Sequence, residues 1–233
     1  MSNHPLLYNI RAAFKENLIP AIFLQFLALF VCISYFYWPA AKPVFLFFAA
    51  LKETYGAVYA ILSTSLFGGA IPFAYLWLSK KIQHNLPGQF VFYLLMWAMM
   101  GAFVDALYNF QAQLFGSDAS LATIVKKVLF DQCLFTALFS CPLLTVMYLW
   151  KDQGFSWQRT KTHLTKELFT LKIPTVILTN WVIWFPAVSV VYAMPTPLQI
   201  PLFNLVLCFF VLLLSMLSKR SADTTADGKL APV

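Results

Sequence analysis

The chain has 233 residues, of which 61% are hydrophobic and only 11% are charged, and its formal net charge is +7. A soluble domain is roughly half apolar and about a quarter charged, so this composition excludes an ordinary soluble protein and indicates an outer surface that faces lipid. The basic residues lie in short segments between apolar stretches rather than beside exposed aromatic side chains, so nucleic acid is not expected as a partner.

Six stretches of the sequence reach the length of about 20 apolar residues that a helix needs to cross a bilayer. They are residues 18–38, 54–78, 89–114, 128–150, 173–194 and 198–217. The sequence therefore predicts an all-α fold, a multi-pass transmembrane helical bundle of about six spans that occupies residues 18–218. Residues 1–17 precede the bundle, and the small polar residues 219–233 are expected to form a disordered tail. The apolar segment 44–51 is too short to span and is expected to lie in the membrane interface.

The distribution of Lys and Arg predicts the orientation of the spans. With six spans, both termini and the second and fourth loops share one side, which holds twelve of the 16 Lys and Arg residues. We therefore expect both termini on the inner side. This pattern favours a bacterial inner membrane, with a mitochondrial inner or peroxisomal membrane as the alternative.

The third predicted span carries polar residues along one face. Gly101, Asp105, Asn109 and Gln113 recur every four residues, and Tyr108 lies beside them. A carboxylate inside a bilayer costs a few kcal/mol and is a functional candidate by default. No Lys or Arg lies inside a predicted span to pair with Asp105, so this carboxylate is expected to be hydrated or protonated.

The fourth and fifth spans add further polar and aromatic candidates, namely Asp131, Gln132, Thr136, Asn180 and Trp184. Asp131 is the less informative carboxylate, because Lys126 and Lys127 could pair with it at the membrane face. The polar residues of spans three to five have two interpretations. They are either interhelical hydrogen bonds that hold the bundle together or the lining of a hydrated path.

The second span carries small residues every four positions, namely Gly56, Ala60, Thr64 and Gly68. Such a stripe lets another helix approach closely, so it predicts helix packing.

Neither an enzyme nor a cofactor is indicated. His4, His84 and His163 lie outside the predicted spans, the four cysteines form no CxxC pair or Cys/His cluster, and there is no Gly-rich phosphate loop. We expect no catalytic set, no metal and no cofactor.

Three segments resemble the family of Mpv-type and 22 kDa peroxisomal membrane proteins, which also has inner mitochondrial membrane relatives. Residues 101–108 resemble the family's Gly-Pro…His…Trp-Tyr segment. Residues 126–135 (KKVLFDQCLF) are similar to its Lys-rich start of an Asp-Gln…Phe helix. Residues 179–188 (TNWVIWFPAV) resemble its Thr-Asn…Trp-Pro segment. The resemblance covers residues 89–218, over half the chain.

The chain departs from the family pattern at several positions. Asp105 and Leu107 stand in place of a His and a Trp, Phe185 separates the Trp from the Pro, and Ser189 stands where a Gln is expected. The resemblance implies a remote member, a small helical membrane bundle related to weakly selective pores for small metabolites.

The leading hypothesis is a channel- or carrier-like protein for small solutes or ions, with a polar seam in spans three to five. In it Asp105 would favour cations or set proton-dependent gating. The alternative is a non-transporting scaffold that acts through its basic loop, Lys151–Lys172. The lipid bilayer is the expected partner in both cases, and the sequence leaves homo-oligomer formation open.

We expect a reporter fused after Lys229 to be shielded from reagents added outside the cell. A reporter inserted after Ser117, between spans three and four, serves as the opposite control and should be labelled. Protease or thiol-reagent accessibility in intact cells measures both, and an accessible Lys229 fusion would show that the orientation is inverted.

Overall fold

The computed structural model describes residues 5–227, and every regular element in that range is a helix. The elements in chain order are α1 (Pro5–Tyr37), η1 (Pro39–Ala41), α2 (Lys42–Thr64), η2 (Ser65–Ala70), α3 (Ile71–Leu78), α4 (Leu86–Phe115), α5 (Leu121–Leu129), η3 (Phe130–Ser140), α6 (Cys141–Asp152), α7 (Trp157–His163), η4 (Leu168–Lys172), α8 (Ile173–Ala193) and α9 (Thr196–Asp227).

Six helical segments are long and apolar enough to cross a membrane. They are 18–37, 39–78, 86–115, 121–152, 168–193 and 196–213. Large apolar side chains cover the outside of the bundle, as Ile19 (72% exposed) and Leu138 (71% exposed) illustrate, and lipid is the medium that such a surface requires. The predicted all-α bundle of six spans is confirmed, and the chain is an integral membrane protein.

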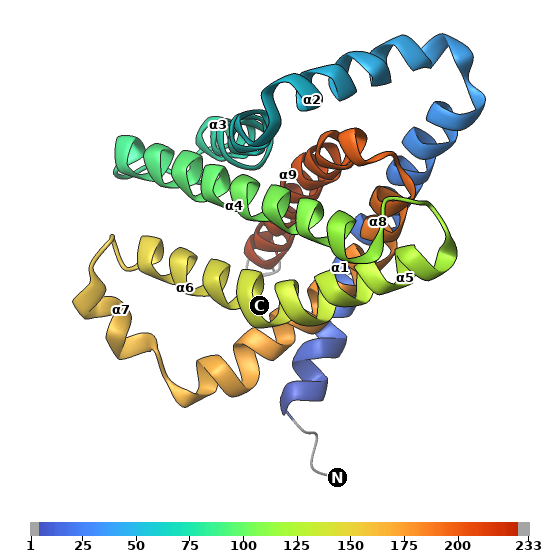
Figure 1. Ribbon diagram of the computed structural model, residues 1–233. Coiled ribbons are helices and arrows are strands. Elements are labelled where there is room, and N and C mark those ends of the chain that lie inside the picture. The colour runs from blue at the N-terminus through green and yellow to red at the C-terminus, as the bar shows by residue number, and fades with distance from the viewer. Residues whose placement is uncertain (1–4, 228–233) are drawn as a thin grey trace.

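The fourth span (α5, η3, α6) and the second (α2, η2, α3) lie on opposite sides of α4 (Figure 1). Helix α2 and η2 pack against α4, while α1 packs against α8 and α9. Because successive spans cross in opposite directions, residues 38–41, 116–120 and 194–195 share one face of the bundle, which we call the hairpin side. Residues 79–85 and 153–167 share the opposite face, the basic-loop side.

Three π-helical segments lie within the spans, and each is followed by a proline at the second position of the next helix. Segment η2 precedes Pro72, η3 precedes Pro142 and η4 precedes Pro174. A proline inside a helix lacks the N–H group, and its ring clashes with the carbonyl four residues earlier. Widening the preceding turn to i→i+5 spacing relieves that clash at these three prolines. Proline alone does not determine the widening, because Pro20, Pro186 and Pro201 lie inside helices with no such segment before them.

The second span begins earlier than predicted. Segment 44–51 is part of a helix that runs from Lys42 to Gly56, where the backbone leaves the helical region at φ 50° and ψ −125°. A positive φ is accessible to glycine without a steric penalty. Gly56 therefore marks a kink, and no atom lies within 4 Å of a Cβ added there, so it takes no part in the predicted packing stripe.

The fourth span also begins earlier, at Leu121 rather than at residue 128. The Ser120 hydroxyl accepts a hydrogen bond from the Thr123 backbone N–H (3.3 Å), which caps the helix. The Asp118 carboxylate accepts hydrogen bonds from the Ser120 backbone N–H (2.9 Å) and the Thr123 hydroxyl (3.0 Å). Hydrogen bonds from Ser120 and Thr123 lower the pKa of Asp118 to about 2.

The predicted disordered tail begins as helix, because α9 continues to Asp227. No Pro or Gly occurs between Leu202 and Asp227, and Gly228 is the first residue after Pro201 that favours a helix end. Residues 228–233 of the predicted tail lie outside the described residues.

The other three small residues of the second span form a close helix contact. A Cβ at Gly101 of α4 would lie 2.5 Å from the Ala60 carbonyl oxygen and 2.8 Å from Thr64 Cβ. A Cβ at Gly68 would lie 2.7 Å from the Trp97 ring. Backbone atoms therefore fill the space at Gly101, which holds α4 against α2.

We expect Gly101→Leu to lower the free energy of unfolding by about 1–3 kcal/mol or more, because the added side chain must push α2 away from α4. Ala106→Leu is the matched control, since Ala106 lies on the exposed face of the same helix and should tolerate leucine. Thermal unfolding of both variants in detergent measures the difference, and equal stability would contradict the close contact.

Candidate functional site

Polar side chains of three spans meet at one cavity inside the bundle, which we call the polar cavity. It has a volume of about 110 Å³ and lies between α4, the η3–α6 part of the fourth span, α8 and α9. Its polar wall consists of Tyr108, Asp131, Gln132, Thr136, Ser140 and Asn180. Its apolar wall includes Trp97, Phe135, Trp184, Phe203, Leu207 and Phe210.

Asp131 is the charged centre of the polar cavity and is 5% exposed. Its Oδ2 accepts a hydrogen bond from the Tyr192 hydroxyl at 2.7 Å. Its Oδ1 accepts from Thr136 Oγ1 at 3.2 Å and from Gln132 Nε2 at 3.1 Å. Thr136 lies five residues after Asp131, so the π-helical widening of η3 brings the two side chains into register.

Gln132 links the fourth span to the fifth and also presents an unused acceptor. Its backbone carbonyl accepts a hydrogen bond from the Trp181 indole N–H at 3.0 Å. Its side chain is 2% exposed, and within the described chain its Oε1 has no hydrogen-bond partner. A buried acceptor without a donor carries a desolvation cost of about 1–3 kcal/mol, so a ligand that donates to Oε1 would recover it.

Tyr108 closes the polar cavity toward the hairpin side. Its ring packs edge-on against Tyr192 (centroids 5.1 Å apart) and Phe203 (6.4 Å). Tyr108 also lines a second space of about 370 Å³, the hairpin-side pocket. One aromatic side chain is thus the common wall of two pockets.

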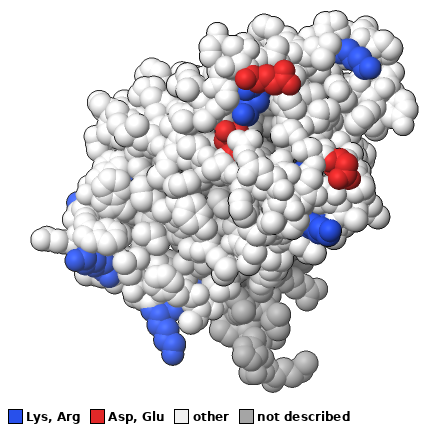
Figure 2. Space-filling view, viewed as in Figure 1, with Lys and Arg blue, Asp and Glu red and all other residues white. Residues whose placement is uncertain are grey.

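The hairpin-side pocket is lined by charged and polar groups, namely Lys52, Glu53, Asp105, Tyr108, Asn109 and Thr196. Lys52 Nζ lies 2.9 Å from Asp105 Oδ1, and their side chains are only 12% and 5% exposed. The space-filling view shows acidic and basic side chains gathered beside α2 in a face that is otherwise largely uncharged (Figure 2).

The ion pair corrects the prediction that Asp105 lacks a cationic partner. Lys52 lies outside the predicted spans, but the helix that runs from Lys42 to Gly56 brings its ammonium group beside α4. The expected pairing of Asp131 with Lys126 or Lys127 is also wrong for the part of the chain that the structure describes. Lys126 is exposed, and Lys127 Nζ lies over the Tyr192 ring, 5.8 Å from its centroid.

The remaining candidate residues of the third span lie in three different environments. Gly101 is a packing position against α2, and Asn109 is exposed at the wall of the hairpin-side pocket. Gln113 is exposed on the outside of α4 and lines neither space. Four residues make slightly more than one turn of an α-helix, so each step of four rotates the side chain further around the helix axis. Asn109 and Gln113, the two later members of the stripe, are therefore exposed rather than buried.

Sequence reasoning missed two residues that shape these spaces, Lys52 and Tyr192. Tyr192 is 61 positions from Asp131, and only the packing of α8 on the fourth span brings them together. The sequence signal for Tyr192 was a hydroxyl inside an apolar stretch, which requires a partner when buried.

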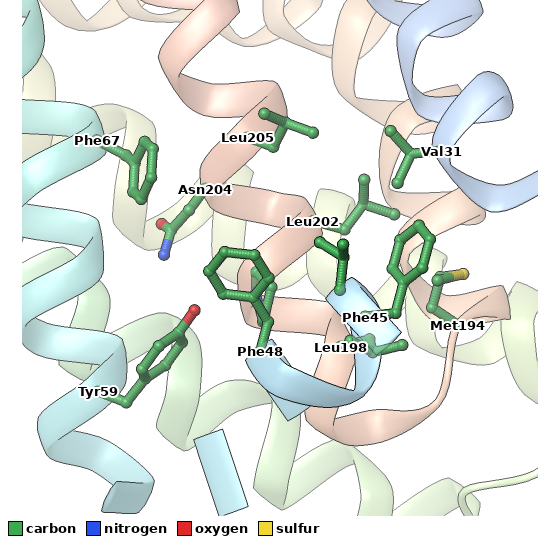
Figure 3. A pocket seen from close by; sticks show the side chains of 12 residues that line it. Val31, Phe45, Phe48, Tyr59, Phe67, Met194, Leu198, Leu202, Asn204 and Leu205 are labelled. Atoms are coloured by element: carbon green, nitrogen blue, oxygen red, sulfur yellow. The ribbon is translucent and has the colours of Figure 1, made fainter. Parts of the chain in front are cut away.

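A further pocket of about 260 Å³ lies between α1, α2 and α9 and is mainly apolar (Figure 3). Phe45, Phe48 and Phe67 line it, and Asn204 supplies a polar side chain. The Asn204 amide already accepts from Thr64 Oγ1 and donates to Ser63 Oγ, both at 2.8 Å. With no charged group in its wall, this pocket is separate in character from the polar seam.

No protein-family model, no curated protein and no solved structure matches this chain.

We expect Lys52→Met to lower the free energy of unfolding by about 3–5 kcal/mol, because it leaves the Asp105 carboxylate buried without a cation. The double variant Lys52→Met/Asp105→Leu should recover much of that loss, since neither charge remains. Lys42→Met, at an exposed position of the same helix, is the control and should have little effect. Denaturant unfolding in micelles measures all three, and a double variant no more stable than Lys52→Met would contradict the expected role of the unpaired carboxylate.

Proposed function

We propose that this integral membrane protein is channel- or carrier-like and passes small polar solutes or ions through the polar seam of spans three to five. The observation that carries the proposal is the position of Tyr108, which separates two polar pockets arranged in series. Apolar constrictions gate some channels, and an aromatic side chain between two pockets supplies such a constriction.

The hairpin-side pocket begins next to the membrane surface. Thr196 and Pro197, which line it, directly follow the hairpin at 194–195. Past Tyr108, the polar cavity continues along α4 and α6 as far as Trp97 and Leu144. A solute that moved past the Tyr108 ring would therefore reach the interior of the bundle.

On the basic-loop side, an aromatic cluster lies one helical turn beyond Trp97 and Leu144. The Phe92 ring packs against Tyr148 (5.7 Å), Tyr93 and Phe155 (both 5.8 Å), and Trp150 (6.3 Å). A path with packed aromatic side chains near both ends would need rearrangement at each end in turn, which favours a carrier or a gated channel over a permanently open pore.

The resemblance to the Mpv-type family agrees with this proposal, and we include remote membership of that family in it. Each of the three resembling segments contributes to the wall of the polar cavity. Tyr108 comes from the first segment, Asp131 and Gln132 from the second, and Asn180 and Trp184 from the third.

The uneven distribution of Lys and Arg supports an orientation with the hairpin side outward and both termini inward, as in a bacterial inner membrane. In this orientation the hairpin-side pocket receives solute from outside. The basic loop then lies on the inner face, where its attraction to anionic lipid explains its charge without a scaffold role.

We expect Tyr108→Ala to raise the permeability of reconstituted liposomes severalfold over wild type, because it removes the wall between the two pockets. Tyr55→Ala is the matched control, since Tyr55 is 58% exposed on the outside of the bundle. Fluxes of radiolabelled glycerol, methylammonium and chloride into liposomes measure the effect. If folded wild type and Tyr108→Ala both leave the liposomes impermeable to all three probes, the transport proposal fails and the scaffold alternative gains support.

A further inference from the structure

Three carboxylates lie within the spans around the two pockets, and the two that are buried, Asp105 and Asp131, differ in their partners, whereas Glu53 is exposed. Asp105 forms an ion pair with Lys52 at 2.9 Å. Asp131 receives hydrogen bonds from three uncharged groups, and no ion pair of Asp131 occurs within residues 5–227. Three uncharged donors do not neutralise a buried negative charge, so a carboxylate in a low-dielectric site either takes up a proton or needs a counter-charge nearby.

The wall around Asp131 is rich in acceptors. Gln132 Nε2 donates to Asp131 Oδ1, which fixes the orientation of the amide, because a flipped amide would set two oxygens against each other. The unpartnered Oε1 of Gln132 is therefore a true acceptor. A carboxylate has about four acceptor positions, so the three donors leave Asp131 one position for a ligand.

Aromatic rings make up much of the remaining wall. Trp184 packs against Phe203 with centroids 5.5 Å apart, and both line the cavity with Tyr108. The faces of aromatic rings attract a cation, most strongly when it is shielded from water. Carboxylate, amide oxygen and aromatic faces together match an ammonium group, which donates hydrogen bonds in some directions and contacts rings in others.

The charged and titratable groups on each neighbouring element limit the affinity. From α5, Lys127 Nζ lies over the Tyr192 ring, so its positive charge opposes a cation at Asp131 from beyond that ring. Helix α4 presents the Tyr108 hydroxyl, α8 presents Tyr192 and α6 presents Cys141. The cavity residues of α9, which are Phe203, Leu207 and Phe210, are uncharged.

We propose that the polar cavity binds a small monovalent cation of the ammonium type, held between the Asp131 carboxylate and Gln132 Oε1 against the rings of Tyr108, Trp184 and Phe203. This inference rests on the proposed function and names the substrate class of its cavity. The volume of about 110 Å³ compares with about 30 Å³ for one water molecule in the liquid. An ion of the size of methylammonium fits, whereas a nucleotide does not.

Equilibrium binding of radiolabelled methylammonium to the purified wild-type protein in detergent tests the site separately from transport. We expect saturable binding that Asp131→Asn weakens by at least about tenfold, since a charge-assisted hydrogen bond is lost. Lys127→Met should tighten binding, because it removes the opposing charge. Asp118→Asn makes the same chemical change in the loop before α5 and should leave the affinity unchanged.

Gln132→Leu keeps the test decisive if Asp131→Asn fails to fold, because it removes the unpartnered acceptor. It should weaken binding severalfold, while Gln113→Leu on the exposed face of α4 should not. Absence of saturable binding, equal affinity in wild type and the Asp131 and Gln132 variants, or displacement by sodium at lower concentration than by ammonium would overturn the inference. In that case, glycerol flux into Tyr108→Ala liposomes would still support the transport proposal. Conversely, methylammonium binding without flux of any probe would overturn the transport proposal but not the binding site.

Discussion

The ion pair between Lys52 and Asp105 determines how charge is distributed through the rest of the bundle. A carboxylate and an ammonium group can both remain inside an apolar bundle when each compensates the other. The pair holds the helix that ends at Gly56 against α4, on the hairpin side of the close contact between Gly101 and Ala60. Once Asp105 is neutralised there, Asp131 is the carboxylate of the seam whose charge the bundle leaves without an ionic partner among the described residues. The hairpin-side pocket lies around the ion pair, and the polar cavity lies around the uncompensated carboxylate.

Prolines shape the polar cavity as directly as its polar residues do. The ring of Pro142 would clash with a carbonyl of a regular α-helical turn before it. The widened segment η3 that precedes it carries Asp131, Gln132, Thr136 and Ser140 on its buried face. In a regular α-helix, residues five positions apart diverge around the axis, so Thr136 would not reach the Asp131 carboxylate as it does at 3.2 Å. The same relation recurs before Pro72 and Pro174, where it bends the second and fifth spans. In a helix of a water-soluble protein, a proline in the interior is mainly destabilising. Here Pro142 sets the register of the buried polar cluster around Asp131.

The number and order of the spans could be predicted from the sequence, because a bilayer demands long apolar stretches wherever the chain crosses it. Tyr108, Asp131, Gln132, Thr136, Asn180 and Trp184, which the sequence singles out in spans three to five, line one cavity, but Phe203, Leu207 and Phe210 of the sixth span line it too. The use of this cavity as a path stays a prediction. What the sequence could not predict was the pairing of charges. Whether Lys52 is in a loop or in a helix depends on the kink at Gly56, and whether Lys127 reaches Asp131 depends on the Tyr192 ring from a distant span. Both are tertiary contacts, and together they reverse the relative importance of the two carboxylates.

The two ends of the proposed path differ in the side chains that would close them. On the hairpin side, closure depends on Tyr108 and its two ring contacts, and a rotation of one side chain would join the pockets. On the basic-loop side, closure depends on Phe92 and four further rings from α4, α6 and the segment after α6, so opening there requires movement of helices rather than of one side chain. Exposed side chains rotate orders of magnitude faster than helices are displaced, but Tyr108 is buried, so its rotation also requires Tyr192 and Phe203 to move. In the proposed path, passage at either end would therefore require packed groups to move, which is the behaviour of a slow carrier rather than of an open pore.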